Sequence, residues 1–400
     1  MKNRILLFIA FAFIFKSYSQ NKIALDNQDN RAITTGIPFL LIASDARAAG
    51  MGDMGVATSV DAYSQQWNSA KYAFSETKSG IGVSYTPYLS RLVNDIFLGN
   101  VTYFNRLDEK SAFGASLRYF SLGEIEFVDG PNDTPRPQKP NELSLDLSYA
   151  LRLSDQFAMS VAMRYLRSDL RLQVDGQDVS AANTFGVDIS GFYQSEEEAY
   201  SNFNGRWRGG FAIQNIGPKF KYDEGAEDNF QPTNLRLGGG FDFIFDDYNK
   251  ISVTAEVAKL LVPTPPVFGY QDLDNDGEQD DNEPTEIISG KDPDVNFLSG
   301  IFQSFGDAPD GFSEELKEFT YAIGAEYVYQ DSFAFRAGYF NESEEKGARK
   351  FLAIGAGFKA NVVNIDLSYL FSASKVQSPL ENTLRFSLTF NFGAGEYLEY

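Results

Sequence analysis

The chain has 400 residues, of which 55 are acidic and 34 basic, and its formal net charge is −21. It contains no cysteine and no histidine, which excludes disulfides, thiol nucleophiles, Ser-His and Cys-His triads and His/Cys metal sites. The strong negative charge disfavours binding to nucleic acid. Aromatic residues make up 15% of the chain, which favours β-structure with large apolar side chains that face a medium other than water.

The N-terminal residues are typical of a signal peptide. Two basic residues precede an apolar run over 5–15, and Ser17 and Ser19 supply the small residues before a cleavage site. At about 1.5 Å per residue the run spans roughly half of a bilayer core, which is too short for a transmembrane helix. We therefore predict export, with a signal peptide over 1–19 and a mature start at Gln20.

Residues 20–78 do not follow a strand pattern. The run over 44–57 is small and Gly-rich, and the run over 61–70 indicates a short helix followed by a turn. Small residues let backbones approach closely, as a segment packed inside a barrel mouth requires, whereas the alternative is a linker. We predict a periplasmic hatch, or plug, with the candidate residues Asp45, Arg47, Gly50, Gly52, Asp53, Gly55, Trp67 and Asn68.

The chain over 79–393 alternates between apolar and polar residues with a period of two, which indicates strands. Leu143, Leu145 and Leu147, for example, alternate with Ser144 and Asp146. A tail over 394–400 follows the last strand. The expected strands lie near 79–88, 95–105, 111–121, 141–153, 156–168, 183–194, 205–216, 233–245, 249–259, 318–330, 332–341, 350–360, 362–372 and 380–393.

The connections between these strands alternate between short and long. Connections after even-numbered strands are mostly short, with the ten residues over 195–204 as an exception, and those after odd-numbered strands are longer. An even strand count with short turns at one end is typical of outer-membrane barrels. The predicted fold is all-β, a 14-stranded antiparallel transmembrane β-barrel in the outer membrane of a Gram-negative bacterium, with loops at the cell surface.

The polar faces of these strands carry charged residues at positions near the middle of the strands. Facing lipid, each charge would cost up to a few kcal/mol near the midplane, so these side chains are expected to face the lumen, where they can be hydrated or pair with one another. The alternative, a soluble β-sandwich or barrel with its apolar face inward, does not account for a charged face of this extent. The residues concerned are Arg118, Asp146, Arg164, Asp188, Arg208, Arg236, Asp242, Glu256, Glu326, Arg336, Asp366 and Arg385.

The longest connection, 260–317, contains a motif with defined metal chemistry. Residues 272–283 match the pattern D-x-[DN]-x-[DN]-G-x₅-E of a calcium-binding loop at every constrained position, whereas the alternative is a solvated acidic loop. Pro284 disfavours a following helix, so a structural Ca²⁺ ion in an extracellular loop is expected rather than a sensor. The predicted ligands are Asp272, Asp274, Asp276, Glu278 through its carbonyl, Asp280 through water, and Glu283.

The same connection carries an apolar stretch over 295–305. Phe297, Ile301, Phe302 and Phe305 fall on one face of a predicted helix. Exposed apolar faces usually meet a partner, so these four residues are predicted to bind one. The alternative is that the helix folds down and caps its own barrel.

The run DARAAGMGDMGVATSVDAYSQQWN over 45–68, placed before a barrel of this size, resembles the PorV family of the type IX secretion system. This family is similar in turn to the long-chain fatty-acid transporters, whose barrels share a Gly-rich N-terminal hatch. The resemblance implies a protein that works with partners. It would receive cargo from a large outer-membrane translocon by binding the C-terminal signal domain of the cargo, and pass it to a sortase-like attachment complex at the cell surface.

Three kinds of function follow from these observations. The first is a non-enzymatic component of type IX protein secretion, in contact with outer-membrane lipid. The second is a transporter of hydrophobic small molecules such as long-chain fatty acids, against which the charged lumen argues. The third is an outer-membrane enzyme, which the lack of histidine disfavours because such enzymes generally depend on histidine as a base.

Overall fold

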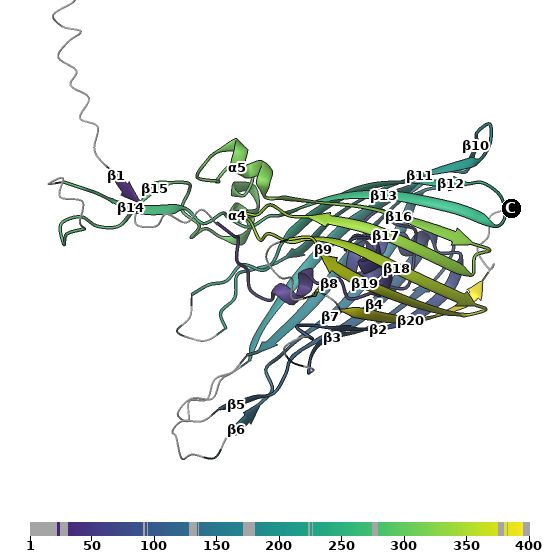
Figure 1. The fold of residues 1–400 in the computed structure, drawn as a ribbon, viewed down its shortest axis with the longest axis horizontal. Helices are drawn as coiled ribbons and strands as arrows, with labels where there is room; N and C mark the ends of the chain where they lie inside the picture. Colours follow the sequence, from purple (N-terminus) through teal and green to yellow (C-terminus); the bar gives the residue numbers. More distant parts are fainter. Residues whose placement is uncertain are drawn as a thin grey trace, which may run out of the picture.

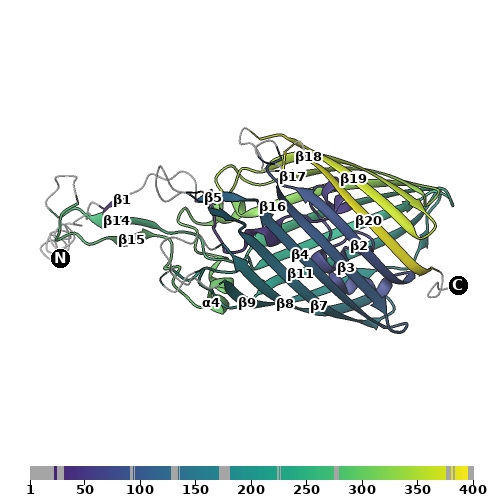
Figure 2. The same cartoon turned by 90° about the horizontal axis from the view of Figure 1, so that it is seen from below.

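The computed structural model describes a barrel with additions at one end (Figures 1 and 2). The residues described are 22–24, 31–90, 93, 95–127, 134, 136–170, 181–222, 225, 227–273, 279–374, 380, 381 and 383–394. The predicted signal peptide lies outside these residues. Among the residues described, no helix is long and apolar enough to cross a membrane.

The main sheet has 15 strands, of which β10 (Glu198–Ala199) has only two residues and the other fourteen are long. Each strand pairs antiparallel with its neighbours, and the pairing of β9 with β11 closes the barrel, so the predicted 14-stranded barrel is confirmed. The strands are β2 (Thr77–Pro87), β3 (Ile96–Arg106), β4 (Ser111–Leu122), β7 (Asn141–Ser154), β8 (Phe157–Asp169), β9 (Ala182–Gln194), β11 (Asn204–Ile216), β12 (Asn234–Ile244), β13 (Asn249–Leu260), β16 (Phe319–Tyr329), β17 (Phe333–Asn341), β18 (Lys350–Ala360), β19 (Val363–Ser372) and β20 (Leu384–Ala394).

The alternation in the sequence sets the two faces of this wall. Leu145 and Leu147 are 43% and 58% exposed on the outside, whereas Ser144 and Asp146 are buried inside. Successive side chains of a strand point to opposite faces, so a period of two gives one apolar outer surface and one polar inner surface. Such an outer surface suits contact with lipid acyl chains.

Smaller elements lie beyond the barrel at the end with the long connections (Figures 1 and 2). Outer-membrane barrels have short periplasmic turns and longer extracellular loops, so this end is extracellular. A three-stranded sheet joins β1 (Lys22–Ala24), β14 (Val267–Gln271) and β15 (Glu286–Ser289), and β5 (Ile125–Phe127) pairs with β6 (Arg136–Gln138). Two short helices, α4 (Phe297–Gln303) and α5 (Phe312–Lys317), belong to the longest connection.

Residues 31–76, here called the inner segment, run through the barrel. They form the 3₁₀ helices η1 (Pro38–Leu41) and η2 (Ser69–Phe74) and the short helices α2 (Ala46–Gly50) and α3 (Ser64–Trp67). α2 contacts β17, β18, β19 and β20, and η2 contacts β3, β4, β7, β8 and β9 on the other side of the barrel (Figure 1).

The direction of the inner segment differs from the sequence-based expectation. β1 pairs with β14 at the extracellular end, whereas Thr77, at the start of β2, pairs with Ala394 at the short-turn end. The chain therefore enters the barrel from the extracellular side and reaches the periplasmic side only where the first barrel strand begins.

Candidate functional site

The predicted hatch residues lie in the inner segment and are tied to one another. The Asp45 carboxylate accepts a hydrogen bond from the backbone N–H of Ala48 at 2.8 Å and another from Trp67 Nε1 at 2.9 Å. Asn68 Nδ2 donates to the carbonyl of Val56 at 3.0 Å and to that of Gly191, in the barrel wall, at 2.9 Å. These buried polar groups fix two turns of the segment to each other and to β9, because an unsatisfied buried polar group is costly.

Arg47 and Asp53 connect the inner segment to the wall. Arg47 Nη2 lies 2.9 Å from Glu326 Oε1, and its Nη1 lies 2.7 Å from Asp61 Oδ2. Asp53 Oδ1 lies 2.9 Å from Arg385 Nη1. Two of the predicted charged hatch residues therefore pair with charged side chains that the strand pattern placed in the lumen.

The predicted glycines allow close backbone approach. A Cβ atom on Gly50 would come within 3.0 Å of Gly355 Cα in β18, and one on Gly55 would come within 2.3 Å of the Trp67 ring. Gly52 has φ +90°, a conformation that other residues rarely adopt, and it lies against the backbone of Tyr339. Larger residues at Gly50 and Gly52 would push the inner segment away from the wall, and one at Gly55 would force two turns of the segment apart.

The mid-strand charges face inward, as the pattern predicted, and they pair with one another. Arg164 forms ion pairs with both Asp146 and Asp188, and Arg118 lies 3.6 Å from Asp146. Arg208 pairs with Asp242 at 2.7 Å. Of the twelve residues named from the sequence, all are buried except Arg236, whose side chain is 12% exposed and pairs with Glu256. Within the described residues, these pairs and the inner segment occupy the barrel interior with charged and hydrogen-bonded groups.

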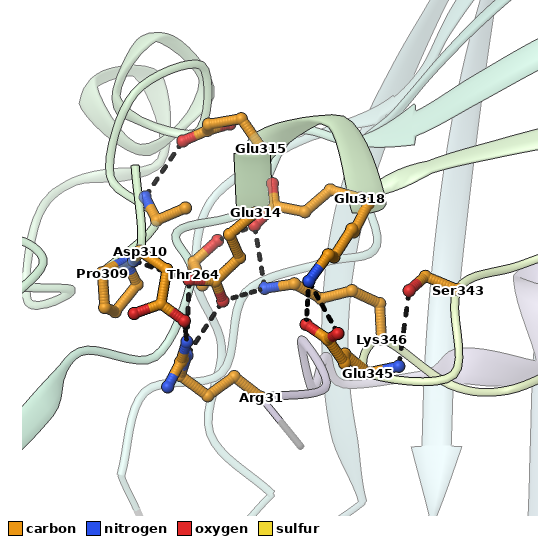
Figure 3. A network of polar contacts seen from close by, with 12 residues as sticks. Arg31, Thr264, Pro309, Asp310, Glu314, Glu315, Glu318, Ser343, Glu345 and Lys346 are labelled. Atoms are coloured by element: carbon orange, nitrogen blue, oxygen red, sulfur yellow. Dashed lines mark hydrogen bonds and ion pairs between the residues drawn. The ribbon is translucent and has the colours of Figure 1, made fainter. Parts of the chain in front are cut away.

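A second set of charges, here called the polar clasp, lies at the extracellular end and was not predicted (Figure 3). The clasp comprises Arg31, Lys259 and Lys346 with Glu314, Glu315 and Glu318. Lys346 Nζ lies 2.7 Å from Glu314 and 3.1 Å from Glu318, and Lys259 pairs with Glu315 and Glu318. The clasp joins four segments: the start of the inner segment, the end of β13, α5, and the connection between β17 and β18.

The pKa values of two carboxyl groups, one in the clasp and one beside it, are shifted from their ordinary values. Burial alone would raise the pKa of Glu314, but hydrogen bonds from Arg31 and Lys346 lower it to about 2. Burial raises the pKa of Asp307 to about 6, although its carboxylate accepts a hydrogen bond from the backbone N–H of Thr264 at 3.1 Å. The other oxygen of Asp307, Oδ1, is buried without a hydrogen-bond partner.

The predicted partner-binding residues do not share one helical face. α4 ends at Gln303, so Phe305 lies beyond the helix, and Phe297 and Ile301 are half-buried. The side chains of Phe302, Leu298 and Phe305 are 78%, 51% and 51% exposed. α5 adds Phe312 at 77% and Leu316 at 48%. The exposed apolar surface, here called the loop surface, therefore consists of these last five residues from two helices and the turn after α4.

The calcium-type motif is only partly described. Asp274, Asp276 and Glu278 lie outside the described residues. Asp272 and Glu283 are buried, and the Glu283 carboxylate accepts hydrogen bonds from the backbone N–H groups of Leu273 and, at 3.2 Å, Asp280. Within the part of the chain that the structure describes, no three acidic side chains are grouped closely enough to hold a metal ion.

Sequence reasoning missed α5 and the clasp. The run over 312–318 carries three glutamates and a lysine at helical spacing, which is a signal for a short charged helix. The basic partners come from residues far away in the chain, such as Arg31, so nothing local in the sequence identified them.

The comparisons with known proteins give a family and a fold. No curated protein matches the chain. Among solved structures, the Pseudomonas putida toluene transporter TodX has a TM-score of 0.51 at 11% identity, covering 88% of this chain and 98% of TodX. A Pseudomonas aeruginosa FadL homologue matches at 12% identity and covers 88% of this chain and 99% of its own. Its TM-score of 0.45 is too low to support an argument about the fold.

The likeness to TodX shows the fold alone. The family comes from the sequence, because the family model described as type IX secretion system protein PorV matches residues 9–267, well over half of the chain. This chain, an outer-membrane β-barrel, therefore belongs to the PorV family of the type IX secretion system.

Proposed function

We propose that this protein is a non-enzymatic component of type IX secretion that binds the C-terminal signal domain of exported cargo and docks with the translocon and a surface attachment complex. Membership of the PorV family supports a role in this secretion system. The observation that carries the docking proposal is the loop surface, because exposed apolar side chains in such number usually mark a site of interaction.

Ion pairs of the polar clasp hold α5, which carries part of the loop surface, and this fixed position is consistent with docking. α5 carries Phe312 and Leu316 on its exposed side, and its glutamates enter the polar clasp on the other side. A binding surface on a fixed support loses less conformational entropy when a partner binds. The clasp therefore favours recognition by a preformed surface over recognition by a loop that must first become ordered.

We also propose a structural calcium ion in the loop over 272–283. The sequence match supports it, and so does the folding of Glu283 back onto Leu273, which brings the two ends of the motif together. At extracellular concentrations calcium would then stiffen the connection that carries the loop surface.

Transport of hydrophobic small molecules is the second candidate. The fold similarity to a toluene transporter favours it. The paired charges and the inner segment inside this barrel weigh against it, since an apolar solute would have to displace them.

Co-purification tests the proposal. A tagged mature protein is extracted in mild detergent with calcium, and bound proteins are identified by mass spectrometry. The double variant Phe302→Ser with Phe312→Ser is compared with Leu107→Ser, which changes a 54% exposed side chain in a short turn at the opposite end.

We expect the wild type and Leu107→Ser to retain a very large barrel protein, or exported proteins that share a C-terminal domain, and the double variant to lose them. Retention by all three proteins would contradict the role of the loop surface. A preparation with no protein partner but with bound fatty acid would contradict the secretion role and favour the transporter.

A further inference from the structure

An apolar groove lies on the outer wall of the barrel, across β11, β12 and β13. Its volume is about 560 Å³. In its floor Gly239 lies opposite Ala255, and Gly209 lies opposite Gly239 on the other side. A Cβ atom on Gly209 would meet nothing within 4 Å, and one on Gly239 would meet only a backbone oxygen at 3.9 Å. Because these two glycines have no side chains, the backbone of the sheet forms the bottom of the groove, and the space above it is open.

Aromatic residues form the sides of the groove. The Trp207 and Phe241 rings, with centroids 4.6 Å apart, line it together with Val253. Tyr200 and Phe203 stack on each other at 5.0 Å, and each makes an edge contact with Phe241. Rings in these arrangements hold one another in place, so the groove keeps its shape.

The residues over 195–203 form the connection that was exceptionally long for its end of the barrel. Tyr200 and Phe203 belong to this connection, which lies at the short-turn end beside β10 (Figure 1), and both rings contact Phe241 of the outer wall. The extra residues therefore supply two aromatic walls of the groove, which a short turn could not do.

The position of the groove indicates which molecules it faces. Gly239 is the middle residue of β12, and Phe241 and Phe243 follow it toward the short-turn, periplasmic end. The groove therefore opens to the periplasmic half of the bilayer, where glycerophospholipids reside. It continues the lipid-facing surface of the barrel, so acyl chains are the molecules that contact it.

The rim of the groove is acidic. Glu196, Glu197 and Glu198 are exposed on the same connection. The Tyr200 hydroxyl lies 3.4 Å from the Glu198 carboxylate, whereas the Glu197 carboxylate pairs with Arg206 at 3.5 Å. The carboxylates of Glu196 and Glu198 at the mouth of an apolar groove favour a cationic headgroup and disfavour an anionic one.

We propose that this groove binds an acyl chain of an amine-bearing glycerophospholipid such as phosphatidylethanolamine, with the ammonium group at Glu196 and Glu198. The apolar groove provides affinity for the chain, and the acidic rim provides the choice of headgroup. The site is separate from the loop surface, which lies at the opposite end of the barrel, so this proposal does not depend on the secretion role.

Native mass spectrometry of the delipidated, detergent-solubilised protein tests the site. Phosphatidylethanolamine, phosphatidylcholine or phosphatidylglycerol is added, and bound lipid is counted. The test variant Gly239→Leu fills the groove. The matched control Gly99→Leu changes an outer-face glycine of β3 that has comparable room, since its Cβ would meet nothing closer than 3.7 Å.

We expect wild type and Gly99→Leu to retain one phosphatidylethanolamine, and Gly239→Leu to bind it about tenfold more weakly, as when two methylene groups stay outside the groove. Phe203→Ala, which removes one wall without adding bulk, should also weaken binding. Equal retention by Gly239→Leu and Gly99→Leu, or by Phe203→Ala and wild type, would overturn the site. Loss of a bound protein instead of a lipid would assign the groove to a protein partner and would also overturn it.

Fluorescence gives a second measurement. Trp207 is 55% exposed at the groove, and the other tryptophan, Trp67, is 2% exposed inside the barrel. Phosphatidylethanolamine with brominated acyl chains should quench Trp207 at near-stoichiometric lipid, and only at higher lipid in Gly239→Leu.

Replacing Glu196 and Glu198 together by Gln tests the choice of headgroup. This variant should lose the preference for phosphatidylethanolamine over phosphatidylglycerol but keep acyl-chain binding. Equal binding of the three lipids by wild type would overturn the assignment of the amine.

Discussion

The guanidinium of Arg31 donates two hydrogen bonds to the carboxylate of Glu314, each of 2.9 Å, across 283 residues of chain. The first residue begins the inner segment, and the second belongs to α5, which carries part of the loop surface. The side chain of Glu314 is 2% exposed and that of Arg31 is 16% exposed, so solvent screens this pair only weakly. The pair therefore links the inner segment to α5, and so to the loop surface that we propose binds partners.

We expect Arg31→Met or Glu314→Gln to loosen α5 and the start of the inner segment together, because each change leaves charges of the clasp without their partner. Hydrogen exchange measures the local opening of both segments. A double-mutant cycle should give a coupling free energy of about 1–3 kcal/mol.

The control is Lys350→Met. Lys350 forms an ion pair of 2.9 Å with Glu344, whose side chain is 71% exposed, so little change in exchange is expected. Additive effects of the two clasp variants would mean that Arg31 and Glu314 act independently.

The pH dependence of the clasp follows from two carboxyl groups with opposite shifts. The pKa of Glu314 is about 2, below its ordinary value of 4.5, so its contribution to stability is present above pH 4.5 and disappears as the pH falls toward 2. The pKa of Asp307 is about 6, above its ordinary value of 3.8. Asp307 therefore costs stability progressively as the pH rises from 3.8 through 6.

We expect the connection over 261–317 to be best protected from proteolysis near pH 4 to 5 and less protected at pH 7. Asp307→Asn should remove most of the loss of protection between pH 5 and pH 7, since the amide stays neutral. Limited proteolysis with a protease active across this range measures the effect, and Glu314→Gln serves as a comparison because it should reduce protection at all pH values above 4.5. An Asp307→Asn protein that still loses protection above pH 5 would contradict the assignment.

The barrel could be predicted from the sequence, and the clasp could not, for a physical reason. Strand alternation is local, because residues two apart share a face whatever lies elsewhere in the chain. The alternation alone therefore places Asp146 and Arg164, which form an ion pair, in the lumen. Arg31 and Glu314 follow no such period, and their contact depends on where the inner segment enters the barrel.

The apolar helix shows an intermediate case. The stretch over 295–305 was correctly predicted to contain a helix, but α4 stops at Gln303, so Phe305 left the predicted face. The residues that complete the loop surface, Phe312 and Leu316, lie in a short, mostly charged helix, so no apolar stretch in the sequence marked them.

The calcium proposal predicts a change in the connection over 261–317 when the metal ion is removed. We expect chelation to speed proteolytic cleavage within this connection while the barrel stays folded, because carboxylates without the ion repel one another. Asp274→Ala should show the chelated behaviour in the presence of calcium. Asp292→Ala is the control, an exposed acidic residue of the same connection outside the motif.

Calcium titration distinguishes a site from general charge screening. Magnesium at the same ionic strength should protect the connection less than calcium does, since a flexible loop of carboxylates suits the larger ion. Equal protection of the connection by both ions, or equal protection by calcium in Asp274→Ala and wild type, would mean that the acidic loop is solvated and holds no specific calcium ion.

The ion pairs of the lumen give the last prediction. Arg164 lies between Asp146 and Asp188, and all three side chains are buried. Arg164→Met leaves the buried carboxylate of Asp188 without its cation and Asp146 with Arg118 alone, so we expect a loss of about 3–5 kcal/mol in the free energy of unfolding. Urea unfolding in detergent, followed by the loss of heat-modifiable migration on gels, measures it.

Arg167→Met on the same strand provides the control. The side chain of Arg167 is 50% exposed and lies 3.6 Å from Asp169, so its removal should change the unfolding midpoint little. Restoring neutrality with Arg164→Met and Asp188→Asn together, which leaves Asp146 paired with Arg118, should recover part of the loss, because the unpaired charge rather than the missing contacts causes most of it. If the single and double variants unfold at the same urea concentration, the charges of the lumen are hydrated and the interior is open to water, which would favour a conducting barrel over a filled one.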